Sequence, residues 1–134
     1  MKSIFFSFLI VAFYTIASSF TLSHTDDHKW ELLGSRTIKH GLDRDEILVT
    51  GWEGRFDAIK IKVRRSGINM HKCIVHFADG SEQNVGLKNQ FSAGSESRVI
   101  DLEGNNRIIR KVVFWYDTKN FRKSKAVVEL WGKH

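Results

Sequence analysis

The chain has 134 residues with 42% hydrophobic content, 12% aromatic content and a formal net charge of +6. This length suits one compact domain and excludes two ordinary ones, while the hydrophobic content excludes a disordered tail and the single cysteine excludes a disulfide scaffold. The sequence also contains no nucleotide-binding loop, zinc-finger spacing or nucleophile elbow, so no motif names an activity.

The N-terminus has the three parts of an export signal. One lysine precedes an apolar stretch over residues 4–16, and the small residues Ala17 and Ser19 occupy the −3 and −1 positions. We therefore expect cleavage after Ser19, which leaves residues 20–134 as a single exported domain, periplasmic or secreted. The apolar stretch is shorter than the roughly 20 residues that cross a bilayer, so we expect no transmembrane segment in the mature form; an uncleaved anchor is the alternative.

The first half of the mature chain alternates apolar and polar residues, as half-buried β-strands do. Three short strands are expected over residues 30–33, 37–40 and 46–49. The clearest alternation covers residues 57–64 and places three apolar side chains opposite three cations: Ile59, Ile61 and Val63 against Lys60, Lys62 and Arg64. This pattern predicts a strand with a basic outer face.

The second half continues in the same way. Residues 68–78 predict a longer strand, with Cys73 in its buried face, that ends in an Asp79-Gly80 turn. Further strands are expected over residues 82–87, 97–102, 108–116 and 126–131, with a turn at 104–106 and a charged loop at 117–125. About eight short strands without a helical segment predict an all-β, two-sheet antiparallel β-sandwich of jelly-roll type, with a closed barrel as the alternative.

Two resemblances are visible in these strands. Five runs resemble a family of small exported bacterial proteins known only as a domain of unknown function: Trp30–Gly34, Asp43–Asp45, Phe77–Gly80, Ser97–Leu102 and Ala126–Trp131. This resemblance covers most of the mature chain and implies no activity. At fold level, the alternating strand, the Phe77-to-Ser81 hairpin and the final strand resemble discoidin-type galactose-binding jelly rolls, which bind sugars or lipid headgroups through loops at one end.

Two groups of residues are candidate metal ligands. Asp43, Asp45 and Glu46 lie within four positions and could begin a structural calcium site, which needs roughly six or more oxygen ligands. The alternative is a solvated turn whose acids pair with arginine and lysine. His71 and Cys73 lie two apart on an expected strand face and would suit zinc or copper, whereas Cys73 is otherwise a core residue.

A hydrolytic site has one candidate location. Ser97, Arg98, Asp101 and Arg107 offer a serine, an acid and two guanidinium groups within a short segment. A hydrolase would also need a histidine base aimed at the serine and an oxyanion hole, and the sequence places neither there. The alternative is a structural network near the strand ends.

Cations beside tryptophans are the strongest functional signal. Trp115 and Trp131 alternate away from the apolar faces of their strands, and if those strands pair, both indoles lie on one basic face. Such a face binds anionic or sugar surfaces by charge and stacking. The predicted ligand-binding residues are Arg110, Lys111, Trp115, Trp131, Lys60 and Lys62.

This signal favours a non-catalytic binding module for anionic or carbohydrate envelope components, such as an acidic glycan or a lipid headgroup. A small envelope hydrolase and a structural or partner-docking protein are the alternatives. Export makes nucleic acid an unexpected partner, no cofactor other than the calcium ion is suggested, and the sequence does not indicate an oligomeric state.

Overall fold

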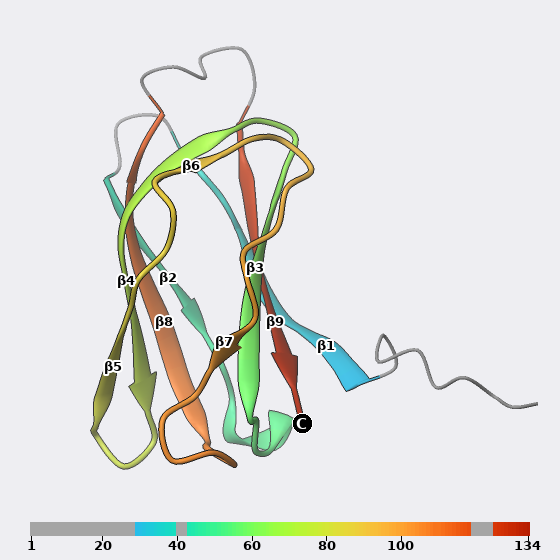
Figure 1. Cartoon of the computed structure of the whole chain (residues 1–134), viewed down its shortest axis with the longest axis vertical. Coiled ribbons are helices and arrows are strands. Elements are labelled where there is room, and N and C mark those ends of the chain that lie inside the picture. The colour runs from blue at the N-terminus through green and yellow to red at the C-terminus, as the bar shows by residue number, and fades with distance from the viewer. Residues whose placement is uncertain (1–28, 40–42, 119–124) are drawn as a thin grey trace, which may run out of the picture.

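The computed structural model describes residues 29–39, 43–118 and 125–134, and within them two antiparallel sheets face each other (Figure 1). The first sheet has the order β1 (Trp30–Thr37), β9 (Val127–Lys133), β3 (Ala58–Arg64) and β7 (Ile100–Asp101). The second has the order β2 (Arg44–Leu48), β8 (Ile109–Asp117), β4 (Ile68–Phe77) and β5 (Glu82–Val85). A short β6 (Gln90–Phe91) also pairs with β4. The predicted export signal lies outside the described residues.

The strand order is that of a jelly roll. Consecutive strands mostly fall in different sheets, because β1, β3, β7 and β9 form one layer and β2, β4, β5 and β8 form the other. The prediction of an all-β, two-sheet antiparallel sandwich of jelly-roll type is therefore confirmed. No helix in the described part of the chain is long and apolar enough to cross a membrane.

The core between the sheets is built from the alternating strands. In β3 the side chains of Ile59, Ile61 and Val63 are fully buried, as their spacing predicts. Cys73 in β4 is also fully buried, so its predicted place in the core is confirmed. The largest fully buried side chains are Tyr116, Phe56, Phe77, Phe91 and Phe114.

Several predicted strand boundaries were wrong. The errors lie at Gly34, where a strand was expected to end, and at the edge of the first sheet that contains β7. The separate strands expected around residues 30–33 and 37–40 are one strand through residue 37, with an irregularity between Leu32 and Gly34. A Cβ atom on Gly34 would lie 2.8 Å from Ile47 Cγ2, so this glycine permits close packing within a strand and does not form a turn. Residue 40 lies outside the described residues.

The expected strand over residues 97–102 is regular only as β7, whose two residues pair with β3. Upstream of β7 the chain forms a loop that makes backbone hydrogen bonds to β3. One of these bonds joins Ser97 N to Ile61 O at 2.7 Å. The short β6 was not predicted, since two residues show no measurable alternation.

A bulge in β4 overturns the predicted common face of His71 and Cys73. The pairing with β8 shifts between Met70 and Lys72, which leaves His71 as an extra residue whose side chain is exposed. Because Cys73 remains in the core, the two side chains point in opposite directions. They cannot bind one metal ion together.

Candidate functional site

The strands that carry Trp115 and Trp131 do not pair, so the condition for a shared face of these two indoles is not met. Trp115 lies in β8 of the second sheet, whereas Trp131 lies in β9 of the first, because the chain crosses between the sheets after β8. Both indoles are partly exposed on the outer faces of their sheets. The predicted binding residues therefore form two groups: Lys60, Lys62 and Trp131 on the first sheet, and Arg110, Lys111 and Trp115 on the second.

The first sheet still brings two indoles together, with Trp30 as the partner of Trp131. Leu32 of β1 lies directly opposite Trp131 of β9, and Trp30 is two residues away on the same face. The two indoles are therefore diagonal neighbours on adjacent strands, a separation that large side chains can span.

Two lysines lie over these indoles. Lys60 Nζ is 4.4 Å from the ring centroid of Trp30, and Lys62 Nζ is 4.5 Å from that of Trp131. Both distances suit cation–π attraction. We call this surface the Trp–Lys face; it consists of Trp30, Trp131, Lys60 and Lys62.

Within the described residues, one carboxylate pairs with both lysines of the Trp–Lys face. The carboxylate of Glu96 is shared between the two lysines, 3.9 Å from Lys60 Nζ and 3.7 Å from Lys62 Nζ. Glu129 forms an ion pair with Arg64, with 2.6 Å between Glu129 Oε1 and Arg64 Nε. The side chains of Lys60 and Lys62 are only 12% and 26% exposed, so their aliphatic stems cover the sheet while one carboxylate serves two ammonium groups.

The second sheet carries a different arrangement around one indole. Arg44 Cζ lies 5.5 Å and Lys72 Nζ 5.0 Å from the ring centroid of Trp115. Lys111 pairs with Glu46 at 3.6 Å, and Arg110 is exposed where the β4–β8 pairing shifts. We call this surface the Trp115 face; its residues are Trp115, Arg44, Lys72, Lys111 and Arg110.

The three carboxylates predicted to begin a calcium site do not converge. Asp45 and Glu46 are successive residues of β2 and therefore point to opposite sides of the sheet. Asp45 lies 3.7 Å from Arg36 Nε, and Glu46 lies 3.6 Å from Arg44 Nη2, while Asp43 precedes the strand. Within the described residues no group of three or more histidine, cysteine, aspartate or glutamate residues is arranged to hold a metal ion. The contacts agree with the alternative, in which these acids pair with cations.

The serine considered as a nucleophile is engaged with the backbone. Ser97 Oγ accepts a hydrogen bond from Ile61 N at 2.9 Å and donates one to Arg98 O at 2.8 Å. The side chain is buried, and these bonds fasten its segment to β3. Its role is therefore structural.

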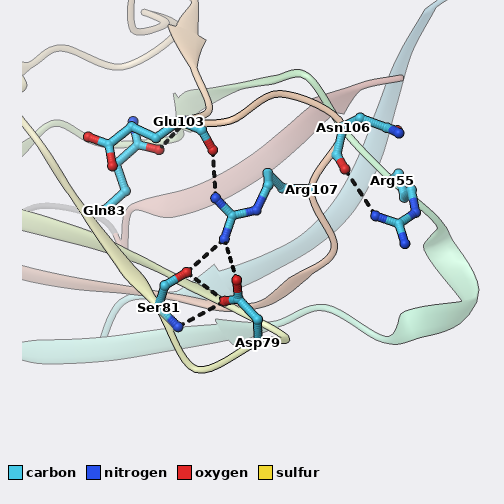
Figure 2. A network of polar contacts seen from close by, with 7 residues as sticks. All are labelled: Arg55, Asp79, Ser81, Gln83, Glu103, Asn106 and Arg107. Atoms are coloured by element: carbon cyan, nitrogen blue, oxygen red, sulfur yellow. Dashed lines mark hydrogen bonds and ion pairs between the residues drawn. The ribbon is translucent and has the colours of Figure 1, made fainter.

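Arg107 joins two turns at one end of the sandwich (Figure 2). Its guanidinium donates to Glu103 O at 2.6 Å, to Ser81 Oγ at 2.7 Å and to Asp79 Oδ2 at 3.0 Å. Its Cζ also lies 3.8 Å from the ring centroid of Phe77. Hydrogen bonds from Ser81, with the nearby Arg107, lower the pKa of Asp79. Arg107 thus belongs to the structural network proposed as the alternative to a hydrolytic site.

Two tryptophans, Trp30 and Trp52, were not among the predicted binding residues. Trp30 was recognisable because it alternates with Leu32, on the side of the strand opposite to the buried Leu33. Trp52 is 98% exposed in a short 3-10 turn, η2 (Gly51–Glu53), and its signal was the glycine on either side of the Trp-Glu pair. An indole so exposed is uncommon in a folded protein.

Comparison with known proteins places the chain in a family. A family model described as "Domain of unknown function (DUF2541)" matches residues 5–132. The chain belongs to the DUF2541 family. The match confirms the resemblance seen in the sequence and covers both sheets of the DUF2541 domain as far as Gly132. No curated protein matches it.

One solved structure resembles the DUF2541 domain at the level of the fold. It comes from a study titled "Structural and functional characterization of Pseudomonas aeruginosa AlgX", with a TM-score of 0.48 and 11% sequence identity. The alignment covers 77% of this chain and 27% of that chain, so the DUF2541 protein spans about a quarter of the AlgX chain.

Proposed function

We propose that the Trp–Lys face binds an acidic glycan of the bacterial envelope without transforming it. The observation that supports this function is the pair of neighbouring indoles, each with a lysine ammonium within 4.5 Å of its ring, on the outer face of one sheet. An indole packs against the apolar side of a sugar ring, and the ammonium groups attract carboxylate or other anionic substituents.

The surroundings support binding rather than chemistry. Leu32, which is 46% exposed, extends the apolar surface beside Trp131. In the part of the chain that the structure describes, the carboxylates of Glu96 and Glu129 beside this face are both in ion pairs with cations. A carboxylate held in this way is less suited to act as a general acid or base. The export signal expected at residues 1–19 would bring this surface to envelope polysaccharides.

The proposal is tested by calorimetric titration of the purified protein with trigalacturonate and with its neutral methyl ester. Trp131→Ala should weaken trigalacturonate binding about 5- to 10-fold, because one surface stacking contact contributes about 1 kcal/mol or a little more. Trp115→Ala is the matched control, since it removes an indole that also contacts cations but lies on the opposite sheet. It should leave the affinity unchanged.

Two further measurements test the charge contribution to binding and the choice between a glycan and a lipid ligand. Raising the salt concentration should weaken binding of trigalacturonate more than binding of the ester, since the exposed charges are screened over roughly 8 Å at physiological strength. Binding lost in Trp115→Ala but kept in Trp131→Ala would place the site on the Trp115 face. Binding to anionic phospholipid vesicles with none to either sugar would overturn the glycan assignment, and so would an absence of all binding.

A further inference from the structure

A small pocket lies between the chain segment around β6 and the segment that precedes β7. It has a volume of about 180 Å³ and is lined by Leu87, Lys88, Phe91, Glu96, Ser97 and Arg98. The first three residues follow β5 in the second sheet or belong to β6, and the last three run beside β3 of the first sheet. In Figure 1 these walls are the yellow chain that rises from β5 to β6 and the orange chain that descends to β7.

The pocket has an apolar floor and a basic rim. Phe91 is fully buried and Leu87 packs against the core, so both supply carbon surface. Lys88 Nζ lies 5.0 Å from the ring centroid of Phe91. Arg98 reaches across the gap, because its Nη2 donates to Gly86 O on the opposite wall at 2.9 Å.

The charge of the rim is not cancelled within the described residues. Among the residues that the structure describes, Arg98 donates to two carbonyl oxygens, those of Gly86 and Val99, and Lys88 lies against the ring of Phe91. The one acid in the pocket, Glu96, is directed toward Lys60 and Lys62 on the neighbouring face. Two cations over an apolar floor suit a ligand that carries a carboxylate on a compact ring.

Glu96 also shows how the pocket relates to the Trp–Lys face. The same residue lines the pocket and pairs with both lysines of that face, so the two surfaces are continuous. Because β3 separates Trp131 from the pocket in the order β1, β9, β3, a glycan that extends from Trp131 past Lys62 and Glu96 runs toward the pocket. We propose that the pocket receives a uronate residue of the bound glycan, with its carboxylate between Lys88 and Arg98; this inference rests on the proposed function.

The test compares trigalacturonate with its methyl ester in the protein and in Lys88→Gln. Lys88 is exposed, so this substitution should leave the melting temperature unchanged. Loss of one charge-assisted contact should weaken trigalacturonate binding about 5- to 10-fold and leave binding of the ester unchanged. The four affinities form a double-mutant cycle that isolates the contact between Lys88 and the carboxylate.

Lys72→Gln is the matched control, because Lys72 also lies over an aromatic ring but belongs to the Trp115 face and does not line the pocket. It should change neither affinity. Arg98→Gln is the second variant of the pocket and should show the same selective loss. Equal weakening of both ligands by Lys88→Gln, or no effect of either pocket variant while Trp131→Ala remains defective, would overturn the pocket and leave the proposed function standing. Failure of the unmodified protein to bind either sugar would overturn both.

Discussion

The thiol of Cys73 shows how completely the space between the sheets is closed. Its side chain is fully buried, and this burial raises the pKa of the thiol to about 12. Because the thiolate is the reactive form, both access and ionisation protect it. The lone cysteine is therefore a structural part of the core.

We predict that an alkylating reagent modifies Cys73 in the native protein only as fast as the domain opens. The rate should be orders of magnitude below that measured in denaturant, and a mass-spectrometric time course under both conditions measures it. Native labelling at the rate of the unfolded chain would show that β4 presents its other face to the core.

His134 makes a polar contact that depends on protonation. Its Nε2 lies 2.6 Å from Glu31 Oε2, its Nδ1 lies 2.9 Å from Arg55 O, and its ring packs on Phe56 with 4.4 Å between centroids. The hydrogen bond with Glu31 raises the pKa of His134. Hydrogen bonds with Glu53 and His134 lower the pKa of Glu31.

These shifts define the pH range in which the pair stabilises the fold. The contribution of His134 is complete below the ordinary histidine pKa and is lost as the pH rises through the raised value. The contribution of Glu31 is present above the ordinary glutamate pKa and is lost as the pH falls through the lowered value. The pair should therefore be most stabilising between about pH 4.3 and 6.5.

We predict that Glu31→Gln lowers the melting temperature most in that range and progressively less above it. The effect should stay below about 1 kcal/mol, because both side chains are nearly half exposed. Thermal melting across a pH series measures it, with Glu103→Gln at another loop as the control. A difference that grows with rising pH would contradict the assignment of a charged His134–Glu31 pair.

Among the elements, β9 is the one whose packing requires a glycine, at position 132. Gly132 faces the core, where a Cβ atom would lie 2.6 Å from Phe56 Cδ1 and 2.8 Å from Leu33 Cδ1. We predict that Gly132→Ala lowers the free energy of unfolding by about 1–3 kcal/mol, because the core must move to admit the methyl group.

Urea denaturation measures this change, and Gly86→Ala is the control. A Cβ atom on Gly86 would have no neighbour within 4 Å, so that variant should be nearly as stable as the unchanged protein. Equal stability of Gly132→Ala and Gly86→Ala would show that β1, β9 and Phe56 are packed less closely than described.

Local sequence predicted the regular parts of the strands and missed their irregularities. The alternation of residues 57–64 identified the buried face of β3 because it extends over the whole strand. The bulge that exposes His71 arises from the register between β4 and β8, which are far apart in the chain. No local pattern encodes that register, so the common face inferred for His71 and Cys73 was wrong.

At the scale of the whole molecule, jelly-roll topology decides which residues share a surface. A short connection between two strands usually indicates a hairpin, and this expectation led to the pairing of Trp115 with Trp131. In this fold the chain crosses to the other sheet after β8, and β9 pairs with β1 and β3 instead. The indole beside Trp131 therefore comes from the beginning of the described chain.

The outward orientation of several candidate residues was thus predictable, and their grouping was not. Alternation showed that Trp131, Lys60 and Lys62 face outward, and the structure places these three together. Trp30 and the pocket residue Arg98 join them through contacts between distant parts of the chain, which composition and spacing do not contain.

The four tryptophans report on three separate surfaces of the molecule. Trp30 and Trp131 lie on the Trp–Lys face, Trp115 lies on the opposite sheet, and Trp52 projects from η2. Each indole N–H gives its own signal in a heteronuclear NMR spectrum of the isotope-labelled protein. One titration therefore locates a ligand on one of these surfaces.

The most direct test of the account is to follow these indole signals while trigalacturonate is added. The account predicts that the signals of Trp30 and Trp131 shift together and saturate, while those of Trp52 and Trp115 stay in place. A shift confined to Trp115 or Trp52, or no shift of any indole signal at saturating ligand, would contradict the claim that the Trp–Lys face binds an acidic glycan.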